Sequence, residues 1–189
     1  TMSEFELNLF RQRSMEAIRQ KAGRGELRFR LPAGYCWTVN GKVEMDPDAR
    51  VQQSLRLVFT KMIELGTARQ VLLWLHNEHV SLPVASHDES GDKILWKPPV
   101  YYHVLAILTN PIYAGAYAFG KTERRTRVVD GRAPKSDGHR KPQQSWTVLL
   151  KDHHPGYITW EQFDRNQKII AENAVQPRTA GRRPLAPIM

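Results

Sequence analysis

The stretch from Asp46 to Leu75 restricts the fold more than any other part of the sequence. Asp46-Pro47 is a typical start of a helix, with the aspartate as N-cap and proline in the first turn. Apolar residues then recur at helical spacing and form one buried stripe. Gly66 is expected to end this helix, and Thr67 to cap a second one that begins at once. Two helices joined by so short a turn must pack at an angle, which indicates a helix-turn-helix-like unit. The first stripe is Val51, Leu55, Val58, Phe59 and Met62, and the second helix carries Val71, Leu72 and Leu75.

Two elements are predicted before this pair. Residues 3–22 have the pattern of a long helix with Ser3 as N-cap, and Gly23 and Gly25 should end it. The run GRGELRFRLPAGY at residues 23–35 is basic and interrupted by glycines, which favours a linker or an extended arm over packed core, and the arm is expected at residues 26–34. Residues 35–45 alternate around Asn40-Gly41, which predicts a hairpin with a type I′ turn.

The second half of the chain alternates helices, strands and loops in the prediction. Residues 76–96 are expected to form a polar loop around a short apolar piece. A third helix over 100–109 should end at Asn110-Pro111, because proline disfavours helical geometry in the residue before it. Residues 114–119 are then predicted as a strand antiparallel to 145–150, with 120–145 as a long mobile basic loop between them. Thr159 and Gln162 have the spacing of a capping box that begins a last helix.

These elements predict an α+β fold. It has a helical, helix-turn-helix-like core, small antiparallel β-hairpins, a long N-terminal helix and a long basic loop. The expected division is residues 1–25 as the long helix, 26–34 as the arm, 35–174 as the main domain and 175–189 as a flexible tail.

The charge of the chain favours a polyanion as partner. There are 28 Lys+Arg against 19 Asp+Glu, a net charge of +9, and the excess is concentrated in residues 11–30, 120–145 and 176–189. Such separated basic patches are expected of a protein that binds nucleic acid, although solvated basic loops are the alternative. The single cysteine, Cys36, excludes an intrachain disulfide and a cysteine-rich zinc site. With no signal sequence and no apolar run of about 18 residues, the sequence favours the cytoplasm, and predicts no membrane association, no cofactor and no small-molecule substrate.

Several segments, in this order, resemble the large serine recombinases. Residues 3–27 resemble the helix that ends the catalytic domain of that family. The run "LPAGYCWT…NGKVEMDPDARVQQSLRLVFTKMIELGTARQVLLWLHNEHVSLP" followed by "VLAILTNPIYAGAYAFGKT" resembles its recombinase domain. The most specific part is the Leu-x-Asn-Pro-x-Tyr-x-Gly pattern from Leu108 to Gly115.

The resemblance implies a division of labour between parts of a longer protein. An upstream catalytic domain would carry a serine nucleophile, and the recombinase domain would grip attachment-site DNA together with a zinc-ribbon domain. We therefore expect a fragment that binds a double-stranded attachment half-site, has no catalytic residues of its own and derives from a bacterial or phage-encoded recombinase.

Three groups of residues are the candidates for DNA contact. The arm and the end of the first helix would follow the backbone or enter the minor groove. The helix at 100–109 would read bases in the major groove, or rest its N-terminal end on phosphates. The basic loop would contact phosphates, which require positive charge but little precise geometry. The candidates are Arg19, Lys21, Arg24, Arg28 and Arg30 in the first group, Lys97, Tyr102 and His103 in the second, and Lys121, Arg124, Arg125, Arg127, Arg140 and Lys141 in the third.

Other interpretations remain open from the sequence. His153 and His154 beside Asp152 raise the alternative of a metal-dependent nuclease, although adjacent side chains rarely point at one metal ion. An RNA-binding module would have the same overall charge. We also expect weak self-association through Phe5, Leu9 and Met15 of the first helix, because in the resembling family this helix pairs with another subunit.

Overall fold

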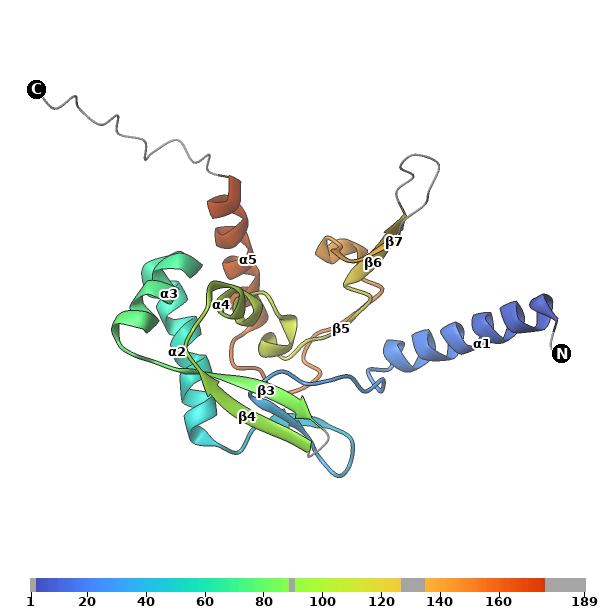
Figure 1. The fold of residues 1–189 in the computed structure, drawn as a ribbon, viewed down its shortest axis with the longest axis horizontal. Helices are drawn as coiled ribbons and strands as arrows, with labels where there is room; N and C mark the ends of the chain where they lie inside the picture. The colour runs from blue at the N-terminus through green and yellow to red at the C-terminus, as the bar shows by residue number, and fades with distance from the viewer. Residues whose placement is uncertain (1–2, 89–90, 127–134, 176–189) are drawn as a thin grey trace, which may run out of the picture.

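The chain folds into a helical body from which a long N-terminal helix and a β-ribbon project (Figure 1). A computed structural model describes residues 3–88, 91–126 and 135–175. The helices are α1 (Glu4–Gly23), α2 (Ala49–Leu65), α3 (Ala68–Asn77), α4 (Tyr101–Leu108) and α5 (Trp160–Val175), with short 3-10 helices η1 (Pro111–Ala114) and η2 (Gln143–Ser145). The strands are β1 (Tyr35–Trp37), β2 (Val43–Met45), β3 (Leu82–Asp88), β4 (Gly91–Lys97), β5 (Tyr117–Phe119), β6 (Thr122–Thr126), β7 (Lys135–Arg140) and β8 (Val148–Leu150). They form four antiparallel pairs, β1–β2, β3–β4, β5–β8 and β6–β7, so the predicted α+β class is confirmed.

The helix pair α2–α3 is confirmed and forms the centre of the core. All five residues of the predicted α2 stripe are buried, and Val71 and Leu75 of α3 pack into the same cluster. Gly66 ends α2 with φ of 71°, and the Thr67 side chain accepts the Gln70 N–H to begin α3. The N-cap of α2, however, is Asp48 and not Asp46. The Asp46 side chain instead accepts the Asp48 N–H at 2.9 Å and so closes the turn that leads into the helix.

The Asn-Pro segment after α4 also ends the helix as predicted, but the chain does not pass directly into a strand. Asn110 caps η1 by accepting the Ile112 N–H, and the strand begins only at Tyr117. Gly115 has φ of 69°, and a Cβ there would lie 2.5 Å from the carbonyl oxygen of His154. This close approach requires glycine, and it brings the segment before α5 against η1. Strand β5 then pairs with β8 antiparallel, as predicted.

The predicted hairpin at residues 35–45 is present with a different turn. Gly41 N–H bonds to Thr38 O and Thr38 N–H to Lys42 O, each at 2.9 Å. Gly41 has φ of 74°, whereas Asn40 is not among the described residues with positive φ. This is a type I turn followed by a glycine bulge, so the predicted type I′ turn is wrong.

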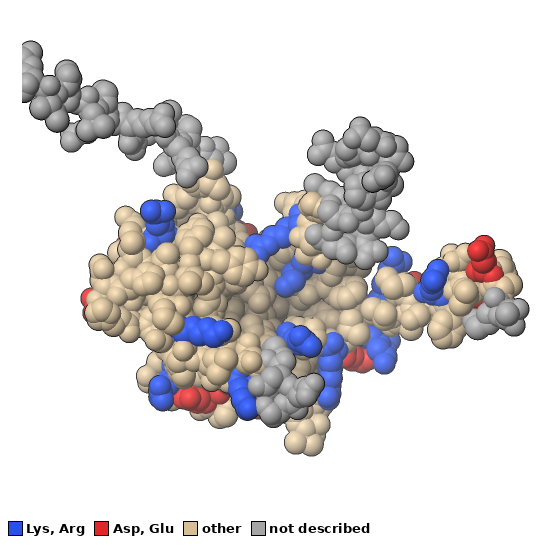
Figure 2. Space-filling model, viewed as in Figure 1, with Lys and Arg blue, Asp and Glu red and all other residues tan. Residues whose placement is uncertain are grey.

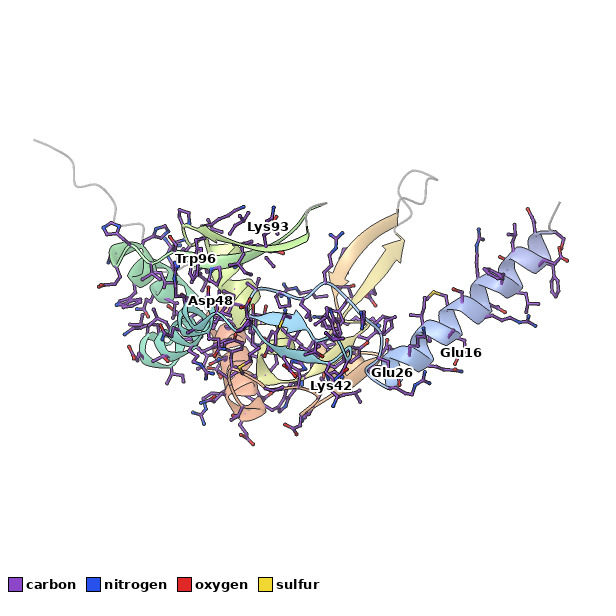
Figure 3. All side chains as sticks on the ribbon, turned by 90° about the horizontal axis from the view of Figure 1, so that it is seen from below. Glu16, Glu26, Lys42, Asp48, Lys93 and Trp96 are labelled. Carbon is purple, nitrogen blue, oxygen red and sulfur yellow. The ribbon has the colours of Figure 1, made fainter. Side chains whose placement is uncertain are left out.

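Two segments predicted as loops contain antiparallel ribbons. In residues 76–96, β3 pairs with β4, because the Leu82 end is buried in the core and Ile94 and Trp96 pack against it. Arg50 of α2 also stacks over Trp96 at 5.0 Å from the ring centroid, and Figure 3 shows Trp96 near Asp48 at the start of α2. In residues 120–145, β6 pairs with β7, so the predicted long basic loop is wrong for these two segments, and residues 127–134 of that prediction lie outside the described part.

The segment between α1 and β1 is packed core in its second half, contrary to the prediction of an arm outside the core. Leu31, Ala33 and Gly34 are buried. The hydroxyl of Tyr113 donates to the Ala33 carbonyl at 2.9 Å, and that of Tyr157 to the Gly34 carbonyl at 2.8 Å. Two tyrosines from distant parts of the sequence therefore fix the end of the arm.

Helix α1 is confirmed, including a capping box between Ser3 and Glu6. It leaves the body with only Ala22 buried (Figure 1). The predicted capping box of α5 is also present, since Thr159 and Gln162 exchange hydrogen bonds of 3.1 and 3.3 Å. In the described part of the chain, no helix has the length and hydropathy needed to cross a lipid bilayer.

Candidate nucleic-acid interface

Three surface hollows meet at Asn110 and Lys121. The first, about 550 Å³, lies between α4, α5 and the start of the β6–β7 ribbon. The second, about 470 Å³, lies along β5 and reaches Leu27 and Phe29 of the arm. The third, about 330 Å³, is enclosed by the arm, β3 and α4. Because Asn110 and Lys121 line all three, the hollows form one continuous surface across elements far apart in the sequence.

This surface unites five of the predicted DNA-contact residues. Arg30 of the arm, His103 of α4 and Lys121 line the third hollow. Lys121 also lines the first, together with Arg140 and Lys141 from the end of the ribbon. Figure 2 shows Lys and Arg side chains on this side of the molecule around the depression between the helical body and the ribbon. Each of the three predicted groups therefore contributes at least one residue.

Lys121 is held in place by the backbone on both sides of it. Gly120 has φ of 71°, and a Cβ there would collide with the Thr147 side chain, so the bend at the end of β5 requires glycine. The Lys121 carbonyl accepts the Lys141 N–H at 2.8 Å. Burial, followed by the nearby positive charge of Arg140, lowers the pKa of the Lys121 ammonium. Keeping the Lys121 ammonium charged in this partly buried position costs free energy. An anion placed between Lys121 and Arg140 would offset part of that cost.

Helix α4 presents its polar residues beside this surface. Tyr102 is 75% exposed, while Val104, Ile107 and Leu108 are buried. Burial, and then the charge of Lys97, lowers the pKa of His103, which places Lys97 close to this histidine. The three predicted residues of this group, Lys97, Tyr102 and His103, therefore gather around the start of α4.

Arg24 and Arg28, before and within the arm, are exposed, and each contacts another side chain. Arg28 lies over the Trp37 ring at 5.4 Å from its centroid. Arg24 makes an ion pair with Glu26 at 3.0 Å, with both side chains more than half exposed. Such an exposed pair contributes little to stability and exchanges readily for a phosphate.

Of the other predicted residues, Arg24, Arg28, Lys97 and Tyr102 do not line the three hollows, and five more lie on α1 or have side chains outside the described part. Arg19 and Lys21 are exposed on α1, away from the helical body (Figure 1). Arg124 and Arg125 belong to β6, and their side chains lie outside the described part. Arg127 is outside the described residues altogether.

His153 and His154 have local structural partners. Their Nδ1 atoms are 3.2 Å apart, and His154 Nε2 lies 2.8 Å from the Ile112 carbonyl oxygen. Burial lowers the pKa of His154; its bond to Ile112 acts in the opposite direction, and the neighbouring His153 adds a smaller lowering effect. Among residues 3–88, 91–126 and 135–175, no group of three or more His, Cys, Asp and Glu side chains is arranged to hold a metal ion. The histidines thus support the turn before α5.

Sequence reasoning missed Asn110 as a candidate. The sequence indicates it only as the residue that ends α4, yet Asn110 lines all three hollows. Gln143, Trp146 and Gln167 of the first hollow were missed as well. The Asn-Pro pattern was the available signal for Asn110, but neighbours from α5 and the ribbon reveal its position only in the folded chain.

The described fold is an α+β domain in which a helix-turn-helix-like core and antiparallel ribbons surround hollows lined by basic residues. The family model described as "Recombinase" matches residues 50–173, and the chain belongs to this family. The resemblance to recombinases proposed from the sequence is thereby confirmed.

The chain is also similar to one known protein in sequence and to two solved structures in fold. The chain is 38% identical over 192 residues to "Uncharacterized protein y4bA/y4pH" of Sinorhizobium fredii (strain NBRC 101917 / NGR234), covering 97% of this chain and 26% of that protein. It therefore spans about a quarter of that relative. Its fold is similar to the structure described as "Crystal Structure of a LSR-DNA Complex", with a TM-score of 0.51, 17% identity, and coverage of 88% of this chain and 41% of the other. A second structure, "Sequence Requirements of the Listeria innocua prophage attP site", matches with a TM-score of 0.46, 19% identity, and coverage of 84% and 50%.

Proposed function

We propose that this chain binds double-stranded DNA at a recombination attachment half-site, as the recombinase-domain part of a site-specific serine recombinase. The observation that carries the proposal is the continuous surface on which Arg30, His103, Lys121, Arg140 and Lys141 gather around connected hollows. Membership of the Recombinase family and a fold similar to that of an LSR–DNA complex support the same function. The site of action is the DNA in the bacterial cytoplasm.

The proposed roles follow from the position of each group. Helix α4 reads base edges through Tyr102 and His103 at its start. The major groove of B-DNA is wide enough to admit an α-helix, which allows these side chains to reach the bases. The arm with Arg28 and Arg30 follows the backbone and the minor groove. Lys121, Arg140 and Lys141 bind phosphates and hold the domain in place, which adds affinity without sequence information.

Salt dependence of DNA binding tests this proposal. Fluorescence anisotropy with a labelled duplex half-site gives the dissociation constant at a series of salt concentrations. If about 6–10 phosphates are contacted, affinity should fall by roughly 10³–10⁵ between about 50 and 200 mM salt. A structured RNA at matched salt is the comparison ligand. Tighter binding to that RNA than to the duplex would favour the RNA-binding alternative.

We also propose that strand cleavage belongs to a catalytic domain of the full-length protein and that this chain alone does not cut DNA. Supercoiled plasmid incubated with the chain and Mg²⁺ or Mn²⁺ should stay intact over hours. Nicking that disappears in His153→Ala would instead support the nuclease alternative.

The exposed apolar side chains of α1 support weak self-association. Phe5 is 75%, Phe10 68% and Met15 50% exposed on a helix that projects from the body. Sedimentation equilibrium at increasing protein concentration should reveal dimers, and Phe5→Ser with Met15→Ser should shift the equilibrium to monomer. A strictly monomeric protein at high concentration would contradict this part of the proposal.

A further inference from the structure

We infer that Asn110 and Lys121 together hold a single phosphate of the bound DNA backbone and so set the register of the domain along the duplex. This inference rests on the proposed function, but it assigns one contact to two particular side chains. Asn110 has a role here beyond ending α4. The evidence comes from unused hydrogen-bond donors, from burial and from the junction of the three hollows.

The amide of Asn110 caps η1 through its oxygen and has an unused donor. Its Oδ1 accepts the Ile112 N–H at 3.4 Å. Its Nδ2 makes no hydrogen bond to any described residue, and no buried side-chain donor in the described part of the chain lacks a partner. The Asn110 NH₂ group therefore keeps contact with solvent, and Asn110 is one of the two residues shared by all three hollows, so its N–H bonds are available to a ligand there.

Lys121 supplies a cation that the protein does not neutralise. The side chain is half-buried, and no carboxylate of the described residues pairs with it. Its charged neighbour is Arg140, whose guanidinium donates to Thr109 Oγ1 at 3.4 Å across the first hollow. A partly desolvated ammonium beside a second cation is costly without an anion, and this cost is recovered when an anion binds.

A phosphodiester fits this pair of donors. Its two non-bridging oxygens share one negative charge, so one accepts from the neutral Asn110 amide and the other from the Lys121 ammonium. Asn110 caps η1 with its side chain, and the backbone of Lys121 is held by the bend at Gly120 and by the Lys141 N–H, so both residues extend from well-defined points of the fold. Contacts to phosphates fix the register and orientation of a protein on the duplex.

Two substitutions separate this role from a structural one. Lys121→Gln keeps a polar side chain, shorter by one methylene group, and removes the charge. Asn110→Asp keeps the oxygen that caps η1 and replaces the NH₂ donor by an anion that repels phosphate. Lys168→Gln is the matched control, because Lys168 lies on α5, pairs with Asp164 at 3.0 Å and lines none of the three hollows.

The experiment is phosphate-ethylation interference on an end-labelled half-site, combined with the salt dependence of affinity. Wild type should show a set of phosphates whose ethylation blocks binding. Both Lys121→Gln and Asn110→Asp should lose interference at the same single phosphate, whereas Lys168→Gln should retain the whole pattern. Lys121→Gln should weaken binding roughly 5–20-fold and reduce the slope of log K against log salt by about 1.

The outcomes distinguish this inference from the proposed function. If wild type binds the half-site and both variants keep the complete interference pattern, the phosphate contact is wrong while DNA binding stands. Loss at two different phosphates would also overturn the shared contact. If wild type binds no duplex at all, the proposed function fails, and this inference fails with it.

Discussion

The buried tyrosines that hold the arm lead to a prediction about stability. Tyr113→Phe and Tyr157→Phe keep both aromatic rings but remove the hydroxyls that donate to the carbonyls of Ala33 and Gly34. Tyr157 is 7% exposed, but the Gly34 carbonyl still accepts the Asp46 N–H at 2.9 Å, so Tyr157→Phe should cost only about 0.5–1.5 kcal/mol. Tyr113 is 2% exposed, and Tyr113→Phe leaves the buried Ala33 carbonyl without this partner, at a cost of about 1–3 kcal/mol. For a chain of this size, that corresponds to a melting temperature lower by roughly 2–12 °C.

Thermal and urea denaturation followed by circular dichroism measure this loss. Tyr101→Phe is the control, because Tyr101 is 48% exposed and has no hydrogen-bonded partner among the described residues. Its free energy of unfolding should change by less than about 0.5 kcal/mol. If Tyr113→Phe and Tyr157→Phe are as stable as this control, the two hydroxyls do not fix the arm and the reasoning is wrong.

Three further substitutions or conditions test other parts of the structure. Gly120→Ala should lower the free energy of unfolding by at least about 1 kcal/mol, because alanine at φ of 71° is strained and its Cβ would meet Thr147. Urea denaturation measures this loss, and the double variant with Thr147→Ala should recover part of it. Thr159→Ala removes the cap of α5 and should cost about 0.5–2 kcal/mol in the same assay, and an unchanged midpoint would show that the cap is not needed. The pKa of His154 is lowered from 6.5 in the folded state, so the unfolded chain takes up its proton first as pH falls. Stability should therefore be complete above about pH 6.5 and decline below it, and His154→Asn should flatten this decline in urea titrations at pH 5 to 8.

Sequence patterns predicted the elements that local interactions determine. The stripe from Val51 to Met62, Gly66 at φ of 71° and the caps at Ser3, Thr67 and Thr159 were all found as expected. In each case, the evidence lies within a few residues of the element itself. Helical periodicity and side-chain capping depend on residues close together in the sequence, so they can be predicted from the sequence alone.

Two errors were local, the N-cap of α2 and the turn type at Gly41, but the larger ones arose where distant contacts decide the structure. Strands β3 and β4 look like a polar loop until Leu82, Ile94 and Trp96 are placed against the core. The basic arm looks unpacked until the tyrosines at 113 and 157 donate to its carbonyls. A propensity for strand or loop is weak compared with such tertiary packing, so these segments were not predictable from local sequence.

The candidate site was predictable in its residue types but not in its geometry. Charge counting alone selected Arg30, Lys121 and Arg140, because clusters of cations are visible in the sequence. It did not select Asn110, a neutral side chain whose importance comes from the meeting of three hollows. Nor did it separate the cations near the hollows from those on α1, since that distinction depends on where the helix projects.

Discrimination between DNA sequences is the property that most directly tests the central claim. A duplex selected by this chain from a randomised library should be compared with a scrambled duplex of equal length and composition, at one fixed salt concentration. We expect the selected duplex to bind about 10³-fold or more tightly, as is usual for specific DNA-binding proteins. Equal dissociation constants for the two duplexes would reduce the basic surface to a non-specific one and contradict recognition of an attachment half-site.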